Sequence, residues 1–116
     1  MPGETIVFFV KFTTLPGVAS PGAEHFSDPF DVTAYKSVVV EDYNAGVTGT
    51  TTVTLQAEQS SDLETWSDKG TSLSPTVGAV ASTSFSDPAR YIRLRATVVG
   101  ANGTVTLWAK AVARDA

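Results

Sequence analysis

The sequence predicts an all-β fold, namely an antiparallel β-sandwich of jelly-roll-like type with six to eight strands. Apolar residues recur with a period of two rather than 3.6, and β-branched residues concentrate where the alternation is clearest. Turns rich in Gly, Pro, Asn and Ser separate these short runs. The chain has 116 residues, 42% apolar and 17% charged, which suffices for one core.

The N-terminal part, residues 1–29, is predicted to hold a strand and a Pro/Gly-rich loop or arm, ahead of a core over residues 30–116. The strand, residues 5–12, is apolar on both faces, and Val7 and Phe9 lie on the face opposite Ile6 and Phe8. A strand of this kind needs cover on both faces. We therefore expect Val7 and Phe9 to contact the rest of the domain or a neighbouring subunit.

Residues 15–29 contain three prolines and two glycines. This composition predicts a long loop without regular structure. A loop of this length usually has a function. We expect it to reach across an interface, together with the preceding strand.

Four further strands are predicted at residues 37–43, 50–58, 65–69 and 79–85. The second of them alternates well, with Val53, Leu55 and Ala57 pointing inward and the polar residues between them outward. This pattern is typical of a half-buried antiparallel strand.

The clearest predicted element is a C-terminal hairpin with its turn at residues 100–103. Its inward residues are predicted to be Ile92, Leu94, Ala96, Val98, Val105, Leu107, Ala109, Ala111 and Ala113. The small side chains near the end indicate that another sheet approaches closely there, so the last strand is predicted to be central.

Composition also restricts the function. The chain has no cysteine, which excludes disulfides and thiolate metal sites. The net charge is −4, although residues 90–116 carry five basic side chains and one acidic. An acidic total argues against general nucleic-acid binding. The apolar run near the start is too short for a membrane span or a signal peptide. The sequence therefore predicts a chain made in the cytoplasm, with no nucleic-acid partner and no membrane partner.

Nothing in the sequence predicts catalysis or a cofactor. The single histidine, His25, lies beside Glu24, Ser27 and Asp28 in one loop, where a catalytic triad would lack a rigid scaffold. No phosphate-binding, zinc-binding or dinucleotide-binding motif is present. We expect a protein that is not an enzyme.

Four carboxylates crowd one strand end and turn: Glu58, Asp62, Glu64 and Asp68. Oxygen ligands of this kind suit calcium, but their spacing matches no defined calcium loop. Asp62 is expected instead to cap its own turn through backbone hydrogen bonds. No metal site is predicted.

Two tryptophans are more informative. Trp66 follows a turn and is expected to close the end of the core. Trp108 has outward parity, and so do aromatic and basic residues on both predicted hairpin strands: Tyr91, Arg93, Arg95, Lys110 and Arg114. A four-residue turn would place Arg95 opposite Trp108, and a two-residue turn would place Tyr91 opposite Arg114.

Three interpretations of this patch stay open: it binds sugar rings, it binds a partner protein, or a loop of the same domain covers it. Protein contact is favoured, because Tyr, Trp and Arg are enriched in protein interfaces.

The segments QSSDLETW at residues 59–66 and RYIRLR at 90–95 resemble jelly-roll modules of bacteriophage virion proteins of the head-decoration, fibre and tail accessory types. The segment DVTAYKS at residues 31–37 fits the same pattern, and the resemblance covers roughly residues 30–113. A similar Arg-Tyr-Ile-Arg ending occurs in discoidin-like, galactose-binding domains. These short motifs indicate architecture better than role.

The resemblance implies a structural protein of a phage or phage-like virion, assembled in the host cytoplasm. In that role the chain is a capsid decoration or accessory subunit, present in many copies. Its partners are then the major capsid protein or another virion protein, together with copies of itself. The alternative is a carbohydrate-binding module, with Tyr91, Arg95 and Trp108 as a platform for a saccharide.

Overall fold

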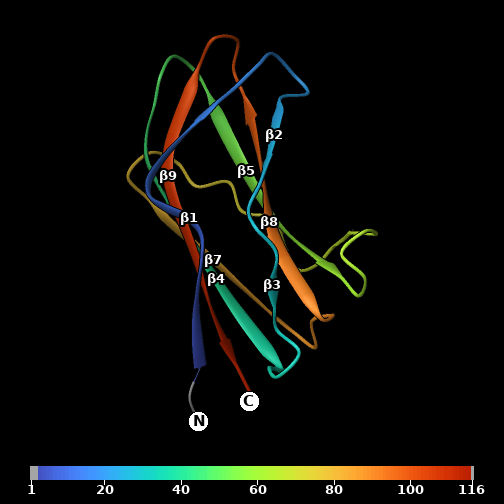
Figure 1. Cartoon of the computed structure of the whole chain (residues 1–116). Helices are drawn as coiled ribbons and strands as arrows, with labels where there is room; N and C mark the ends of the chain where they lie inside the picture. The colour runs from blue at the N-terminus through green and yellow to red at the C-terminus, as the bar shows by residue number, and fades with distance from the viewer. Residues whose placement is uncertain (1–2, 116) are drawn as a thin grey trace.

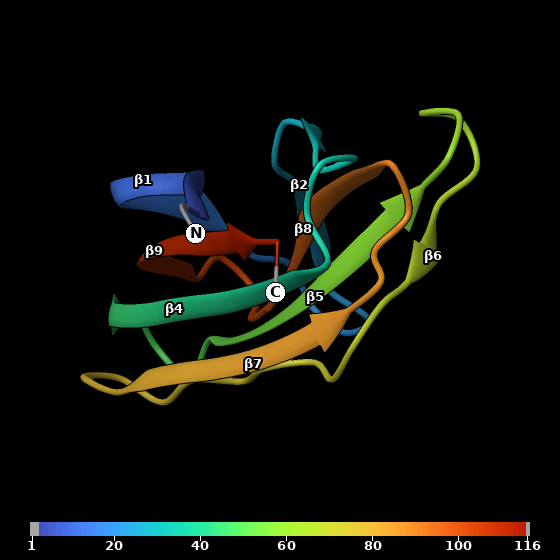
Figure 2. The ribbon, with the colours of Figure 1, turned by 90° about the horizontal axis from the view of Figure 1, so that it is seen from below.

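The computed structural model describes residues 3–115, which form nine strands in two antiparallel sheets packed face to face (Figures 1 and 2). The strands are β1 (Gly3–Pro16), β2 (Ala23–Phe26), β3 (Phe30–Asp31), β4 (Ser37–Val47), β5 (Thr52–Ser60), β6 (Ser67–Asp68), β7 (Val80–Ser86), β8 (Tyr91–Val99) and β9 (Thr104–Arg114). Across residues 3–115 there is no helix that is both long and apolar enough to cross a membrane. The predicted all-β sandwich is confirmed.

The strand order is that of a jelly roll. One sheet has the order β1-β9-β4-β7, and the other has β2-β8-β5-β6 with β3 also paired to β8. If β2 and β3 are treated as one interrupted strand along β8, the chain is a long double ribbon. First pairs with last, second with second to last, and so on inward to β5 with β6. Winding this ribbon produces the two sheets.

The core fills the space between the sheets, as the alternation in the sequence predicted. All nine inward residues predicted for the two C-terminal strands are at most 1% exposed. On β5, Val53, Leu55 and Ala57 are buried as well. The prediction that the last strand is central is also confirmed, because β9 lies between β1 and β4.

The predicted C-terminal hairpin is wrong, although its two strands and their inward faces are right. β8 pairs with β2, β3 and β5, whereas β9 pairs with β1 and β4. The turn at residues 100–103 therefore carries the chain from one sheet to the other. An arch of this kind and a hairpin bury the same alternate residues, so the alternation does not distinguish them.

Strand β1 changes its facing residues partway along its length. Its register against β9 shifts between Val7 and Phe9 and again between Phe9 and Thr13. Because a bulge reverses which side chains point inward, both Phe8 and Phe9 are buried, while Val10 is 64% exposed. Phe9 is therefore covered by the rest of the domain, which is the first of the two predicted alternatives, and Val10 lies on the outer face in its place.

The expectation that residues 15–29 hold no regular structure is wrong for β2, which pairs with β8 from Ala23 to Phe26. The three prolines lie outside β2 and β3. Pro16 ends β1, Pro21 lies in the turn before β2, and Pro29 precedes β3. The stretch between the last two has its backbone N–H groups free to pair. These two short strands raise the number above the predicted six to eight.

Candidate interaction surfaces

The structure divides the predicted aromatic and basic patch between two opposite outer faces. Trp108, Lys110 and Arg114 lie on the outer face of the β1-β9-β4-β7 sheet, here called the β9 face. Tyr91 and the two arginines of β8 lie on the outer face of the other sheet, here called the β8 face. Neither predicted pairing across a hairpin forms, because β8 and β9 do not share a sheet.

An aromatic row crosses the whole β9 face. Trp108 and Tyr43 are register partners on β9 and β4, and their rings stack with centroids 5.8 Å apart and planes inclined by 28°. Val80 on β7 is the next register partner of Tyr43. On the other side, the bulged stretch of β1 that contains Val10 lies opposite Trp108, between the register pairs Phe9–Ala109 and Thr13–Leu107.

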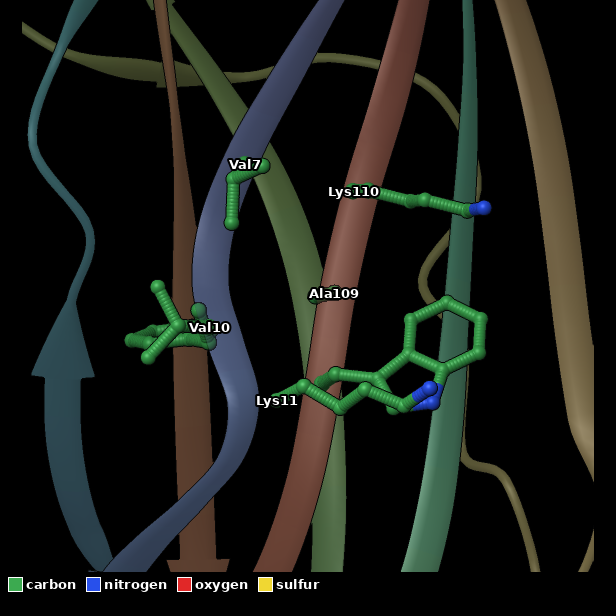
Figure 3. A pocket seen from close by; sticks show the side chains of 7 residues that line it. Val7, Val10, Lys11, Ala109 and Lys110 are labelled. Carbon is green, nitrogen blue, oxygen red and sulfur yellow. The ribbon is translucent and has the colours of Figure 1, made fainter.

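Beside this row lies a shallow groove of about 400 Å³ between β1 and β9. Figure 3 shows Val7 and Val10 on β1, and Lys110 reaching from β9 across β4. The ammonium group of Lys110 lies 5.2 Å from the centroid of the Trp108 ring and 3.7 Å from a carboxylate oxygen of Glu41. Lys11 also lines the groove. The groove is therefore apolar at its base and basic at its rim.

Two more rows follow along the same central strands. Lys110 on β9 faces Glu41 on β4, and Val112 faces Val39 one row further on. A second, smaller hollow of about 200 Å³ is lined by these four residues together with Ala111 and Arg114. Arg114 is exposed at the end of β9.

The β8 face is built differently, since its basic residues already have partners within the chain. The guanidinium group of Arg93 lies between two aromatic rings, 4.2 Å from the centroid of Phe26 and 4.2 Å from that of Trp66. Its Nε also donates a hydrogen bond of 2.7 Å to Glu58. Trp66 therefore stacks on this outer face, which corrects the expectation that it closes the end of the core.

Arg95 completes this network. It donates hydrogen bonds of 2.6 Å to Glu58 and 3.3 Å to Asp68. Glu58 is only 5% exposed, so two arginines neutralise a carboxylate that is almost out of water. The β8 face thus satisfies most of its own charge and leaves little for a partner.

The remaining predicted polar residues have local roles. Asp62 accepts hydrogen bonds from the backbone N–H groups of Thr65 and Glu64, which lower the pKa of its carboxyl group. It caps its own turn, as predicted. The Nε2 of His25 donates a 2.7 Å hydrogen bond to the carbonyl of Pro16. Tyr91 lies beside Arg90, whose guanidinium is 5.0 Å from its ring centroid.

The sequence-based selection missed Tyr43, Val80 and Val10, which complete the aromatic row. The outward position of Tyr43 could not be read from the sequence, because three consecutive valines and two consecutive acidic residues precede it and give neither face of the strand an apolar alternation. Its neighbour on β9 could not be read either, because Tyr43 and Trp108 are separated by more than sixty residues of chain. Val10 depends on the bulge, which the alternation hides.

Comparisons with known proteins support the fold. No protein-family model matches the chain, and no curated protein matches it significantly in sequence. Solved structures do match it. The PBSX exported protein XepA matches with a TM-score of 0.70 and 14% identity, over 97% of this chain and 37% of that chain.

Two other structures represent further phage and viral proteins. The SPBc2 prophage-derived protein YomS matches with a TM-score of 0.56 and 14% identity, over 95% of this chain and 92% of that one. Infectious bursal disease virus strain Gx matches with a TM-score of 0.65 and 12% identity, over 97% of this chain and 33% of that one. The chain thus spans about a third of the length of XepA and of the viral protein. At these identities the likeness shows a shared β-sandwich, and the predicted resemblance to phage modules is confirmed at the level of the fold.

Proposed function

We propose that this chain is a non-enzymatic structural protein of a phage or phage-like virion, a capsid decoration or accessory subunit that binds the particle in many copies. The observation that carries the proposal is the β9 face, where an aromatic row spans four strands and no element within residues 3–115 covers it. Val10 at one end of the row is 64% exposed and Val80 at the other is 55% exposed. Contiguous exposed apolar surface of this kind marks a site of protein contact.

The composition of the face supports a protein partner. Trp and Tyr at the centre with charged residues beside them is the arrangement found in protein interfaces, where buried aromatics carry most of the binding energy. The fold likeness to proteins of prophages and of a virus particle agrees with this role. The partner on the particle is the major capsid protein or another virion protein, and the protein is located in the virion.

Replacing the central aromatic tests the proposal. Trp108→Asp puts a charge at the middle of the aromatic row, and we expect at least a tenfold loss of copies per particle, because a charge buried in an interface without a partner is costly. The measurement is quantitative mass spectrometry of particles purified on a density gradient from cells that produce the phage. Leu63→Asp is the matched control, since Leu63 is a 45% exposed apolar residue in a loop outside the β9 face.

The parent protein should co-migrate with particles in many copies, and the control should match it. Recovery of the parent protein only among free soluble proteins would reject the virion role. Equal loading of Trp108→Asp and parent would reject the β9 face as the contact.

A carbohydrate-binding module is the second candidate, favoured by one observation. The groove beside Trp108 has an apolar base and two lysine side chains, Lys11 and Lys110, along its lining. An aromatic ring with donors nearby can hold a sugar ring. Tyr91 and Arg95 lie on the opposite face and are not part of such a site. Saccharide titration that quenches tryptophan fluorescence in the parent and not in Trp108→Ala would favour this candidate.

A further inference from the structure

The three rows at the centre of the β9 face have complementary members on neighbouring strands. In the first row Trp108 on β9 faces Tyr43 on β4, in the second Lys110 faces Glu41, and in the third Val112 faces Val39. Two of the rows therefore pair an apolar residue with an apolar residue, and the middle row pairs a positive charge with a negative one. A surface with this property is complementary to itself.

We propose that the partner on the β9 face is a second copy of this chain, packed face to face about a two-fold axis that runs parallel to the strands between β9 and β4. Such an axis lays β9 of one copy over β4 of the other. Trp108 then meets the second copy's Tyr43, Lys110 meets the second copy's Glu41, and Val112 meets the second copy's Val39. This inference rests on the proposed function in taking the β9 face as a contact between virion proteins. The virion protein that covers this face is then the second copy, and the chain attaches to the particle as a pair.

The charges select this axis over the other simple choice. An axis running across the strands through the aromatic row would place Trp108 on Trp108 and turn Lys110 toward Thr106, which lies on the far side of the row. Lys110 and Glu41 would then keep their pairing within one chain, 3.7 Å apart, but neither would face an opposite charge on the second copy. The axis parallel to the strands gives each an opposite charge across the interface and keeps the strands of the two copies aligned.

The outer strands fit the same arrangement. The axis lays β1 over β7 of the second copy, so Val10 reaches Val80 and the exposed ends of the aromatic row cover each other. Four strands at about 4.8 Å spacing give a contact of roughly 500 Å² per copy, or about 1,000 Å² in total. This area lies at the lower limit for specific interfaces, so we expect an association that depends on protein concentration in the micromolar range.

Charge reversal provides the test. Lys110→Glu makes both central charged positions acidic, and Glu41→Lys makes both basic. Each variant alone should self-associate at least about tenfold more weakly than the parent, because like charges then meet across the axis. An equimolar mixture of the two should form a one-to-one pair, since every contact across the axis again joins opposite charges. The measurement is sedimentation equilibrium of the full chain, with native mass spectrometry of the mixture after one variant is given a mass tag.

The mixture separates this contact from an effect within one chain, because each variant still carries its own like-charged neighbours. Glu64→Lys is the matched control for Glu41→Lys: it makes the same change of charge in an exposed loop outside the β9 face and should associate as the parent does. A parent chain that is monomeric up to about 1 mM would overturn the proposal. So would single variants that pair like the parent, or a mixture that stays monomeric.

The two proposals fail separately. A parent that pairs in solution but never loads onto particles would keep the second copy and reject the virion role. A monomeric parent whose loading onto particles still depends on Trp108 would keep the virion role and reject the second copy.

Discussion

At the scale of single residues, Asp42 places a carboxyl group in the core, where it lowers the stability of the fold. It lies on β4 with inward parity, between Ala109 on β9 and Ala81 on β7, and it is 0% exposed. Neither of its carboxylate oxygens has a hydrogen-bond partner among residues 3–115. Burial, and secondarily the charge of Glu41, raise the pKa of Asp42 to about 7. The core therefore holds this carboxyl group neutral in mild acid and charged, at a cost, above neutral pH.

This leads to a pH-dependent effect of Asp42→Asn. With a raised pKa in the folded state, the carboxyl group destabilises the fold progressively as pH rises from about 4 to about 7, because only the unfolded chain ionises freely in that range. The variant should therefore match the parent near pH 4. At pH 8 it should be more stable, by up to about 4 kcal/mol.

Urea unfolding at both pH values, followed by circular dichroism, measures the difference. Glu64→Gln is the control, since it removes a charge from an exposed loop outside β4. A constant difference between parent and Asp42→Asn across this pH range would show that Asp42 is solvated or paired in solution.

At the scale of elements, β1 combines two tasks that an unbroken strand cannot. Its first part alternates normally, with Ile6 inward and Val7 outward, and its bulge then turns Phe9 into the core. The same bulge projects Val10 to the end of the aromatic row. A bulge also interrupts the exposed edge of the strand, which protects it from pairing with a foreign strand.

The bulge predicts opposite outcomes for neighbouring residues. Phe9→Ala should destabilise the fold by about 3 to 5 kcal/mol, because Phe9 is 8% exposed and its loss leaves a cavity. Val10→Ala should change the free energy of unfolding by less than about 0.5 kcal/mol, since the side chain is mostly in water. Denaturant unfolding of both variants measures these values. A larger loss for Val10→Ala than for Phe9→Ala would mean that β1 alternates without a bulge, as the sequence alone suggests.

The element scale also shows what the sequence predicts well and what it does not. Strand positions and inward faces on β5, β8 and β9 follow from alternation, which depends only on local parity. The sheet to which a strand belongs depends on the turn. At the turn between β8 and β9, a Cβ on Gly103 would collide with Oγ1 of Thr51, so this glycine lets the loop before β5 pack against the crossing chain. The local sequence pattern does not predict this contact, because the two residues are far apart in the chain.

At the scale of the whole molecule, the jelly-roll winding makes the N-terminal part indispensable. β1 pairs with β9 along most of its length, and β2 pairs with β8. Core positions are supplied by four residues of this part: Ile6, Phe8, Phe9 and Leu15. The division predicted at residue 29 places a strand and an arm outside the core, whereas the observed pairing places these strands within both sheets.

Deletion of residues 1–29 tests this organisation. We expect the truncated chain to lose cooperative unfolding, because it lacks four core side chains and exposes the edges of β9 and β8. Thermal unfolding followed by circular dichroism measures the loss. A synthetic peptide of residues 1–29, added to the truncated chain, should restore the transition. A truncated chain that unfolds cooperatively by itself would support the division at residue 29.

The candidate site could be predicted only in part at this scale. Trp108, Lys110 and Val7 were correctly placed on an outer surface from parity alone. The predicted hairpin places Tyr91, Arg93 and Arg95 on the same surface, because they share the outward parity of the preceding strand. The winding of the chain separates them by the full thickness of the sandwich, and that separation is set by contacts between distant parts of the chain.

The pairing of β1 with β9 also has a mechanical consequence. Gly3 lies opposite Arg114, so β1 begins and β9 ends at the same end of the sandwich (Figure 1). A force that pulls the two termini apart would break the hydrogen bonds between β1 and β9 one after another, starting at the termini, rather than all at once. A subunit tethered by both termini would open under modest tension.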